Sequence, residues 1–240
     1  PEREHAETLE QGDPNLLPEL TGALEMGLEK SWQKGNLNFT IYRQDIKNPI
    51  QRVNKVYNDT ILNRVFTNAS KALQIGMEVN LTNSITPYWQ SMISGNLYRY
   101  KIDGTIFDGA VIVSNASIIY SINSTQSIKI QKGLALQLSI NYLSNRITAQ
   151  GEDGAFVTPH LSLKKTTQDQ QWTFQMQWLN IDMGSKISNR QRITTRGSNF
   201  YTTTNYIYET DQIQFSLSFN MSKRNRKITL PVSDIAEKEF

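Results

Sequence analysis

The feature that most constrains the fold is a strict alternation of apolar and polar residues along most of the chain. In one segment, Leu134, Leu136, Leu138 and Ile140 alternate with small or amide side chains. Successive side chains of a β-strand point to opposite faces, so this pattern predicts a strand with one apolar face. The alternation predicts about nine strands, near residues 20–29, 37–42, 73–82, 88–102, 116–123, 134–142, 161–164, 172–178 and 213–221. We therefore expect an all-β protein.

The connections between the predicted strands alternate in length. Short ones fall at 33–36, 84–87, 131–133 and 168–170, and longer polar ones at 48–64, 103–109, 149–154 and 184–205. Short turns at one end and long loops at the other are typical of an antiparallel up-and-down barrel in an outer membrane, with the short turns in the periplasm. Trp32, Trp89 and Trp172 lie beside short turns, where an interfacial aromatic belt would place them. Tryptophans that close an ordinary core at strand ends would lie there too.

Period two does not say which face of a strand is wet, so a soluble or surface-exposed β-sandwich that binds a ligand is an alternative. Two features favour the barrel. The polar faces carry Gln, Asn, Ser, Thr and Gly more often than Lys and Glu, as a hydrogen-bonded lumen would. The repeat is also long, at about 27 residues per strand, whereas sandwiches repeat roughly every 8 to 12.

Composition argues against several classes of function. The chain has no cysteine, and its two histidines, His5 and His160, are far apart, so we expect no metal and no other cofactor. The net charge is only +3, and the basic residues are scattered except at 223–227, which does not favour nucleic-acid binding. His160 next to Ser162 leaves an outer-membrane hydrolase as a second alternative. The sequence contains no Gly-x-Ser-x-Gly motif, and we expect a protein that is not an enzyme.

Several segments, in order along the chain, resemble motifs of TonB-dependent outer-membrane receptors. They are GDPNLLPE at 12–19, LEMGLE at 24–29, NPIQ at 48–51 with NAS at 68–70 and GME at 76–78, LNIDMG at 179–184, and the alternating segment 212–221. The resemblance extends over essentially the whole chain. It is to the branch of these receptors described as outer membrane protein β-barrels.

The resemblance implies the C-terminal portion of a larger, 22-stranded transmembrane β-barrel. Residues 1–19 would be an extracellular loop leading into the barrel, 20–221 the C-terminal strands and loops, and 222–240 a periplasmic tail. The implied location is the cell outer membrane, and the implied activity is TonB-energised uptake of a scarce nutrient (a siderophore, vitamin, glycan or peptide). We expect the plug, the TonB box and the signal peptide of such receptors upstream of this chain.

The implied partners are outer-membrane lipid, the barrel-assembly machinery, the remaining N-terminal barrel strands, and the TonB complex through the plug. Candidate ligand contacts are basic and aromatic residues of the predicted long loops: Arg52, Lys55, Tyr57, Arg64, Phe107, Arg190, Arg192, Arg196, Phe200 and Tyr201. Ordinary solvated loop positions are the alternative for each of them. The rows expected to face lipid or to serve assembly contain Leu134, Leu136, Leu138, Ile140, Trp172, Phe174, Phe215, Leu217 and Phe219.

Overall fold

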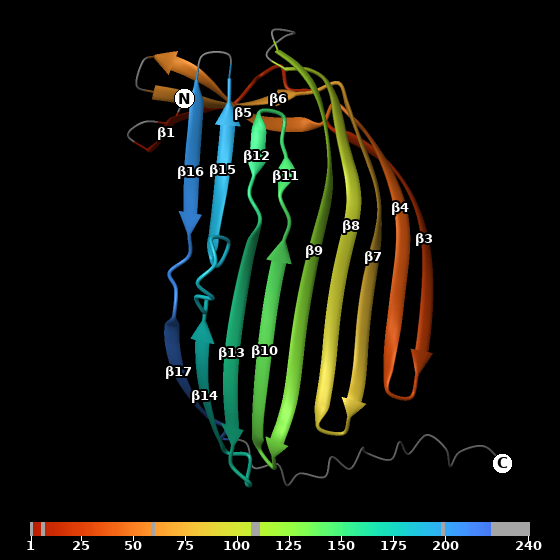
Figure 1. Ribbon diagram of the computed structural model, residues 1–240, viewed down its shortest axis with the longest axis vertical. Helices are drawn as coiled ribbons and strands as arrows, with labels where there is room; N and C mark the ends of the chain where they lie inside the picture. Colours follow the sequence, from red (N-terminus) through yellow and green to blue (C-terminus); the bar gives the residue numbers. More distant parts are fainter. Residues whose placement is uncertain (1, 6–7, 59–60, 107–110, 198–199, 222–240) are drawn as a thin grey trace, which may run out of the picture.

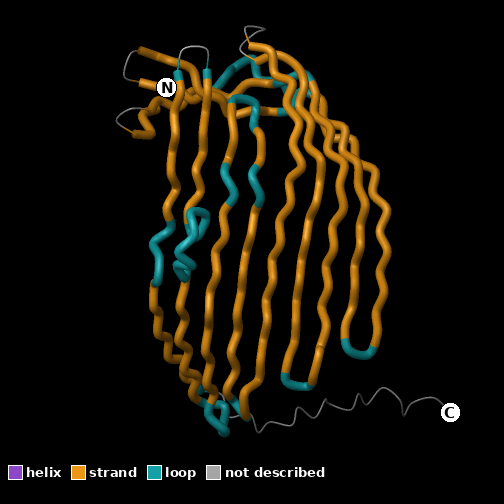
Figure 2. Tube along the Cα trace, viewed as in Figure 1, coloured by secondary structure: helices purple, strands orange, loops and turns teal. Residues whose placement is uncertain are grey.

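A computed structural model describes residues 2–5, 8–58, 61–106, 111–197 and 200–221 of the chain. In this part of the chain every regular element is a β-strand (Figures 1 and 2). The described residues contain no helix that is long and apolar enough to cross a membrane.

Nine of the strands form one antiparallel sheet, which we call the wall (Figure 1). Its order is β17-β14-β13-β10-β9-β8-β7-β4-β3. The strands are β3 (Leu20–Trp32), β4 (Gly35–Lys47), β7 (Lys71–Thr86), β8 (Trp89–Ile106), β9 (Val111–Gln131), β10 (Leu134–Leu143), β13 (Phe156–Thr166), β14 (Trp172–Leu179) and β17 (Gln212–Phe219). Each corresponds to one of the segments in which apolar and polar residues alternate. The predicted all-β, antiparallel up-and-down architecture is therefore confirmed.

Four short turns join neighbouring wall strands at one end of the sheet, the lower end in Figure 2. They connect β3 to β4, β7 to β8, β9 to β10 and β13 to β14, at the four places where the sequence predicts short connections. Gly133 in one of these turns has a φ of 75°, a conformation that a residue without a Cβ adopts at little cost. The other ends of these strands lie at the opposite end of the wall.

The register of the wall separates an apolar face from a polar face. Across β4, β7 and β8, Ile41 pairs with Met77 and Met77 with Leu97. The neighbouring rows on the polar face carry threonine, asparagine and glutamate. Apolar side chains are widely exposed on their face: Leu24 is 73% and Phe215 76% exposed. A soluble sandwich would bury such a face, whereas a barrel turns it to lipid.

The long connections contain more structure than the predicted polar loops. β11 (Arg146–Ile147), β12 (Gly151–Asp153), β15 (Arg190–Arg196) and β16 (Tyr201–Ile207) form a second antiparallel sheet in the order β11-β12-β15-β16. That order matches β10-β13-β14-β17, the wall strands that these four continue. We call this extension the upper sheet. The prediction of loops at 149–154 and 184–205 missed these strands.

A buried asparagine organises the break between the wall and the upper sheet. The Asn189 side chain is fully buried, and its Nδ2 donates to the carbonyls of Asn180 and Ile181, both at 2.9 Å. Asn180, Asn189 and Asp211 all have φ values near 54°, a left-handed conformation that asparagine and aspartate tolerate better than most residues. These contacts hold the end of β14 close to the start of β15.

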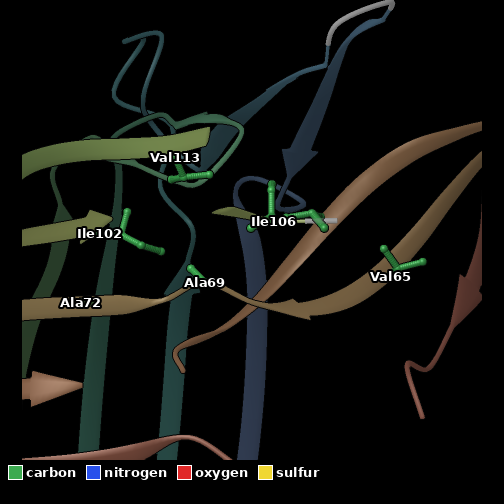
Figure 3. Close-up of a cluster of buried hydrophobic side chains, with 7 residues drawn as sticks. Val65, Ala69, Ala72, Ile102, Ile106 and Val113 are labelled. Atoms are coloured by element: carbon green, nitrogen blue, oxygen red, sulfur yellow. The ribbon is translucent and has the colours of Figure 1, made fainter. Parts of the chain in front are cut away.

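The segment predicted as a polar loop at 48–64 is instead a hairpin of β5 (Ile50–Asn58) and β6 (Ile61–Asn68), which we call the mouth hairpin. Its sheet also includes β1 (Glu2–His5) and β2 (Thr8–Gln11), and β2 runs parallel to β6. Val53 and Val65 of the hairpin belong to one buried apolar cluster with Ala72, Ile102 and Val113 on the polar face of the wall. Figure 3 shows this cluster, with Val65 at its hairpin side. The hairpin therefore folds inward over that face rather than away from the sheet.

The wall curves but does not close, because β3 and β17 form the two edges of the described sheet (Figure 1). Every residue of β3 is exposed. An open strand edge is a ready template for pairing with another strand.

Candidate functional site

A cavity of about 450 Å³ lies on the polar face of the wall, close to the mouth hairpin. Three structures line it: the wall, the mouth hairpin and the upper sheet. Their contributions include Gln74, Tyr98, Tyr100 and Ile119 from the wall, Gln51, Arg52, Asn54 and Arg64 from the hairpin, and Arg146, Gln150, Asp153, Ile193, Thr204 and Tyr206 from the upper sheet and its turns. We call this space the mouth cavity.

The charge of the mouth cavity is predominantly positive. Three arginines line it, Arg52, Arg64 and Arg146, against a single carboxylate, Asp153. Arg146 Nε donates to the buried Asp153 carboxylate at 2.6 Å, and Arg52 donates to Glu10 at 3.1 Å. Arginine binds planar anions such as carboxylates and phosphates through its fixed fork of donors, so the cavity suits a ligand with negative charge.

The remaining polar groups add neutral hydrogen-bonding capacity. Tyr98, Tyr100 and Tyr206 contribute three phenols, and several asparagine and glutamine side chains contribute amides. Phenols and amides can both donate and accept, so they match a ligand rich in oxygen. Among the described residues, no group of three or more histidine, aspartate or glutamate side chains is placed to hold a metal ion.

Gln150 holds the mouth hairpin against the upper sheet. Its Oε1 accepts from the Asn54 backbone N–H at 2.7 Å, and its Nε2 donates to the Asn54 carbonyl at 2.9 Å. The turn that carries Gln150 is itself fixed to the wall, because Asn115 Nδ2 donates to the Thr148 carbonyl at 2.8 Å. These contacts set the distance between two sides of the mouth cavity.

On the wall side, two tyrosines pack over a glycine. A Cβ at Gly76 would lie 2.5 Å from Tyr98 Cβ and 2.8 Å from Tyr42 Cζ, so the rings fill the space that a side chain would need. Gln74 Nε2 donates to the Tyr42 hydroxyl at 3.1 Å, which in turn donates to Asn96 Oδ1 at 3.0 Å. The network orients Gln74 toward the mouth cavity.

A second hollow, of about 600 Å³, lies on the opposite face of the upper sheet. Arg192, Arg196 and Tyr201 line it together with Glu152. The Arg196 guanidinium lies 5.4 Å from the Tyr201 ring centroid, within the range of a cation–π contact. The Thr203 hydroxyl donates to the Tyr201 hydroxyl, and this hydrogen bond lowers the pKa of Tyr201 below its ordinary value.

The predicted ligand contacts lie in two separate hollows and at exposed positions outside both. Arg52 and Arg64 line the mouth cavity, while Arg192, Arg196 and Tyr201 line the second hollow. Lys55 and Arg190 are exposed outside both, and the Phe200 ring packs over Gly197. Phe107 and the Tyr57 side chain lie outside the described residues.

Sequence reasoning missed several residues of the mouth cavity, above all Arg146, Tyr98 and Tyr100. The two tyrosines occupy polar-face positions near the end of β8, so their parity could have placed them in the lumen. Arg146 gave no comparable signal, because its position depends on how the upper sheet forms.

His160 lies on the polar face of β13, and its Nδ1 accepts from the Asn180 backbone N–H at 3.1 Å.

The rows expected to face lipid all lie on the apolar face of the wall. Leu136 pairs with Ile128 and Leu163, and Phe174 pairs with Leu217. The same face carries Leu134, Leu138, Ile140, Trp172, Phe215 and Phe219. An apolar face that continues across neighbouring strands, with aromatic rings near the short turns, matches the lipid-facing band of an outer-membrane barrel.

Comparison with protein families agrees with this geometry. The model of the outer membrane protein beta-barrel family matches residues 1–219. The chain belongs to this family. Its location is therefore the outer membrane, and we expect the apolar face of its wall to be the lipid face. From the general arrangement of such barrels, we expect the short turns to be periplasmic and the mouth hairpin to be extracellular.

No curated protein sequence matches the chain. Among solved structures, the chain is similar to a glycine-to-valine mutant of the ferric enterobactin receptor from Pseudomonas aeruginosa, with 17% sequence identity and a TM-score of 0.44. The similarity covers 68% of this chain and 25% of that receptor chain. The chain thus spans about a quarter of the length of that receptor.

Proposed function

We propose that this chain forms the C-terminal wall and mouth of a TonB-dependent outer-membrane receptor that takes up a scarce nutrient. The observation that carries the proposal is the mouth cavity, a polar, arginine-rich space on the lumenal face at the extracellular end. The ordered receptor-like motifs in the sequence support the same function. In this proposal the protein is a transporter and not an enzyme.

The chemistry of the mouth cavity favours an anionic, oxygen-rich nutrient. Arg52 and Arg64 reach it from the mouth hairpin and Arg146 from the upper sheet, so a bound anion would connect two separate parts of the extracellular surface. Charge-assisted hydrogen bonds of this kind are worth roughly 1.5–3 kcal/mol each. A siderophore, an acidic glycan or an acidic peptide would satisfy these groups.

The rest of the transport machinery would come from other segments and partners. In the proposal, β3 and β17 pair with the remaining strands of a larger barrel, and a plug upstream of this chain contacts the TonB complex. The barrel-assembly machinery would recognise the exposed apolar row of β17. Energy has to come from the inner membrane, because the outer membrane holds no ATP.

Uptake by intact cells tests the proposal. The full-length protein would be produced in a strain that lacks its own copy, and uptake of labelled ferric siderophores, cobalamin, acidic glycans and peptides would be measured with and without TonB. We expect one of these classes to enter only when both proteins are present. Accumulation that is the same in cells without TonB would contradict the proposed energy coupling.

Two variants connect uptake to the mouth cavity. Arg52→Gln with Arg64→Gln removes two cavity cations, and Lys55→Gln with Arg190→Gln removes two exposed cations elsewhere on the extracellular part. We expect the cavity variant to raise the half-saturating nutrient concentration at least about tenfold, since a lost charged contact is worth about 1.4 kcal/mol or more. The control variant should keep the unmodified value.

A further inference from the structure

The lipid face of the wall contains an apolar hollow of about 650 Å³, at the level where the strands approach their extracellular ends. We call it the outer hollow. Exposed aliphatic and thioether side chains of β3, β4, β7, β8 and β9 line it: Leu24, Met26, Ile41, Ile75, Met77, Leu97 and Ile118. A hollow of this composition suits hydrocarbon chains that run alongside the strands.

Two arginines stand at the extracellular rim of the outer hollow. Arg43 and Arg99 both pair with Ile75, one from each side, so the three residues form one row on the lipid face. Neighbouring strands lie about 4.8 Å apart, which separates the two arginine positions by roughly 10 Å. Both side chains are exposed. Arg43 also binds Asp45 at 2.8 Å, whereas among the described residues Arg99 has no ion pair.

Further cations lie in the next rows of the same face. Lys101 pairs with Leu73 and binds Asp103 at 2.9 Å, and Lys47 pairs directly with Lys71. Like charges opposite each other on one face of a sheet repel. Asp103 pairs with Lys71 from the other side and offsets part of this repulsion, and a further anion near Lys47 would offset more of it. In total, five cations against two carboxylates stand above the outer hollow.

Most of the charge on this face lies at its extracellular end. At the turn end, the same strands present Trp32 and Trp89, with Lys30 as the cation of those rows. A smaller apolar hollow of about 360 Å³ on β13, β14 and β17 is bordered by one cation, Lys165. Apolar volume and clustered positive charge therefore coincide at the outer hollow.

From this coincidence we infer that the outer hollow binds one molecule of a multiply acylated glycolipid of the outer leaflet that carries at least two phosphates. Its acyl chains occupy the outer hollow. One phosphate lies between Arg43 and Arg99, and another lies near Lys47 and Lys71. The two pairs of cations lie in rows four residues apart along β7, so they match two phosphates rather than the single phosphate of a glycerophospholipid. The inference depends on the lipid face and not on the transported nutrient.

Native mass spectrometry of the full-length protein, purified in mild detergent, tests the inference. Delipidated protein would be incubated with bis-phosphorylated lipid A, with the same lipid after removal of its phosphates, and with dioleoyl phosphatidylglycerol. We expect a one-to-one adduct with the bis-phosphorylated lipid at a concentration at least tenfold below that needed for the other two. Equal binding of all three lipids would overturn the inference.

A pair of variants locates the lipid. Arg43→Gln with Arg99→Gln should weaken binding at least tenfold, whereas Lys30→Gln with Lys165→Gln, which removes two cations of the same face elsewhere, should leave it unchanged. Equal losses in both variants would show general interfacial charge rather than a site. If the arginine variant fails to fold, the comparison of the three lipids on the unmodified protein still decides the question.

Discussion

The Gln150 side chain binds the backbone of Asn54 at both of its ends, although 96 residues separate the two. The amide oxygen accepts from the N–H, and the amide nitrogen donates to the carbonyl. This is the pairing that a neighbouring strand would make, supplied by one side chain. It joins the mouth hairpin to the upper sheet across the mouth cavity.

Removing the Gln150 side chain should loosen the mouth hairpin without unfolding the wall. Two neutral hydrogen bonds are worth about 1 kcal/mol each, so Gln150→Ala should speed hydrogen exchange at the Asn54 amide by roughly 10- to 30-fold. Asn54→Ala is the control, because Asn54 contributes only backbone groups to the pairing. Exchange that is equally fast in both variants would show that the pairing does not hold the hairpin.

Gly76 should tolerate no side chain. A Cβ there would lie 2.5 Å from Tyr98 Cβ and 2.7 Å from the Leu97 carbonyl oxygen. Overpacking of this kind costs about 1–3 kcal/mol. In lipid vesicles, Gly76→Ala should therefore lower the urea concentration at which half of the protein is unfolded. Gly27→Ala on the same face is the matched control, since its nearest neighbour, Thr40 Oγ1, lies at 3.6 Å. A Gly76→Ala midpoint as high as that of the control would argue against the tyrosine packing.

Leu136 should tolerate no charge. It lies on the lipid face between Ile128 and Leu163, so Leu136→Arg should destabilise the barrel by up to about 2–4 kcal/mol, depending on its depth in the bilayer. Gln137→Arg places the same charge one residue along, on the lumenal face, and should cost much less. Refolding yields in vesicles compare the two, and similar losses would contradict the assigned faces.

The turn between β13 and β14 should respond to acid. The Thr167 hydroxyl and the Gln171 N–H both donate to the Asp169 carboxylate, and these hydrogen bonds lower its pKa below the ordinary value. A lowered folded-state pKa adds stability above the unfolded pKa of about 3.9, and this stability is lost as the pH falls through the folded pKa. The difference in unfolding free energy between the unmodified protein and Asp169→Asn should therefore shrink below about pH 4. A difference that stays constant from pH 6 to pH 3 would contradict this role.

The nine wall strands and their short turns could be predicted because period two is a local property of the sequence. Each strand needs only its own alternating residues, and the turn at Gly133 needs only one residue with a positive φ. The mouth hairpin could not be predicted in the same way. Two valines, Val53 and Val65, do not make an alternating pattern that defines a strand. They are buried in a cluster with wall residues such as Ile102 and Val113, which are distant in the sequence.

Part of the candidate site could be predicted, because some of its residues can be recognised from one stretch of sequence. Arg52 and Arg64 could be found because they are basic residues in a long connection. Arg146, Tyr98 and Tyr100 line the same cavity from elements distant in the sequence, so their common location depends on the fold as a whole.

The roles of the mouth cavity and of the outer hollow both depend on which face of the wall meets lipid, and the absence of cysteine from the sequence makes a direct measurement practical. Single cysteines at 134–141 in β10 would each carry a fluorophore, in the full-length protein with any other cysteine removed, in vesicles of brominated lipid. We predict strong quenching at the even positions from Leu134 to Ile140 and weak quenching at the odd positions from Ala135 to Asn141. Quenching that does not alternate, or that alternates in the opposite sense, would contradict the assignment of the apolar face to lipid.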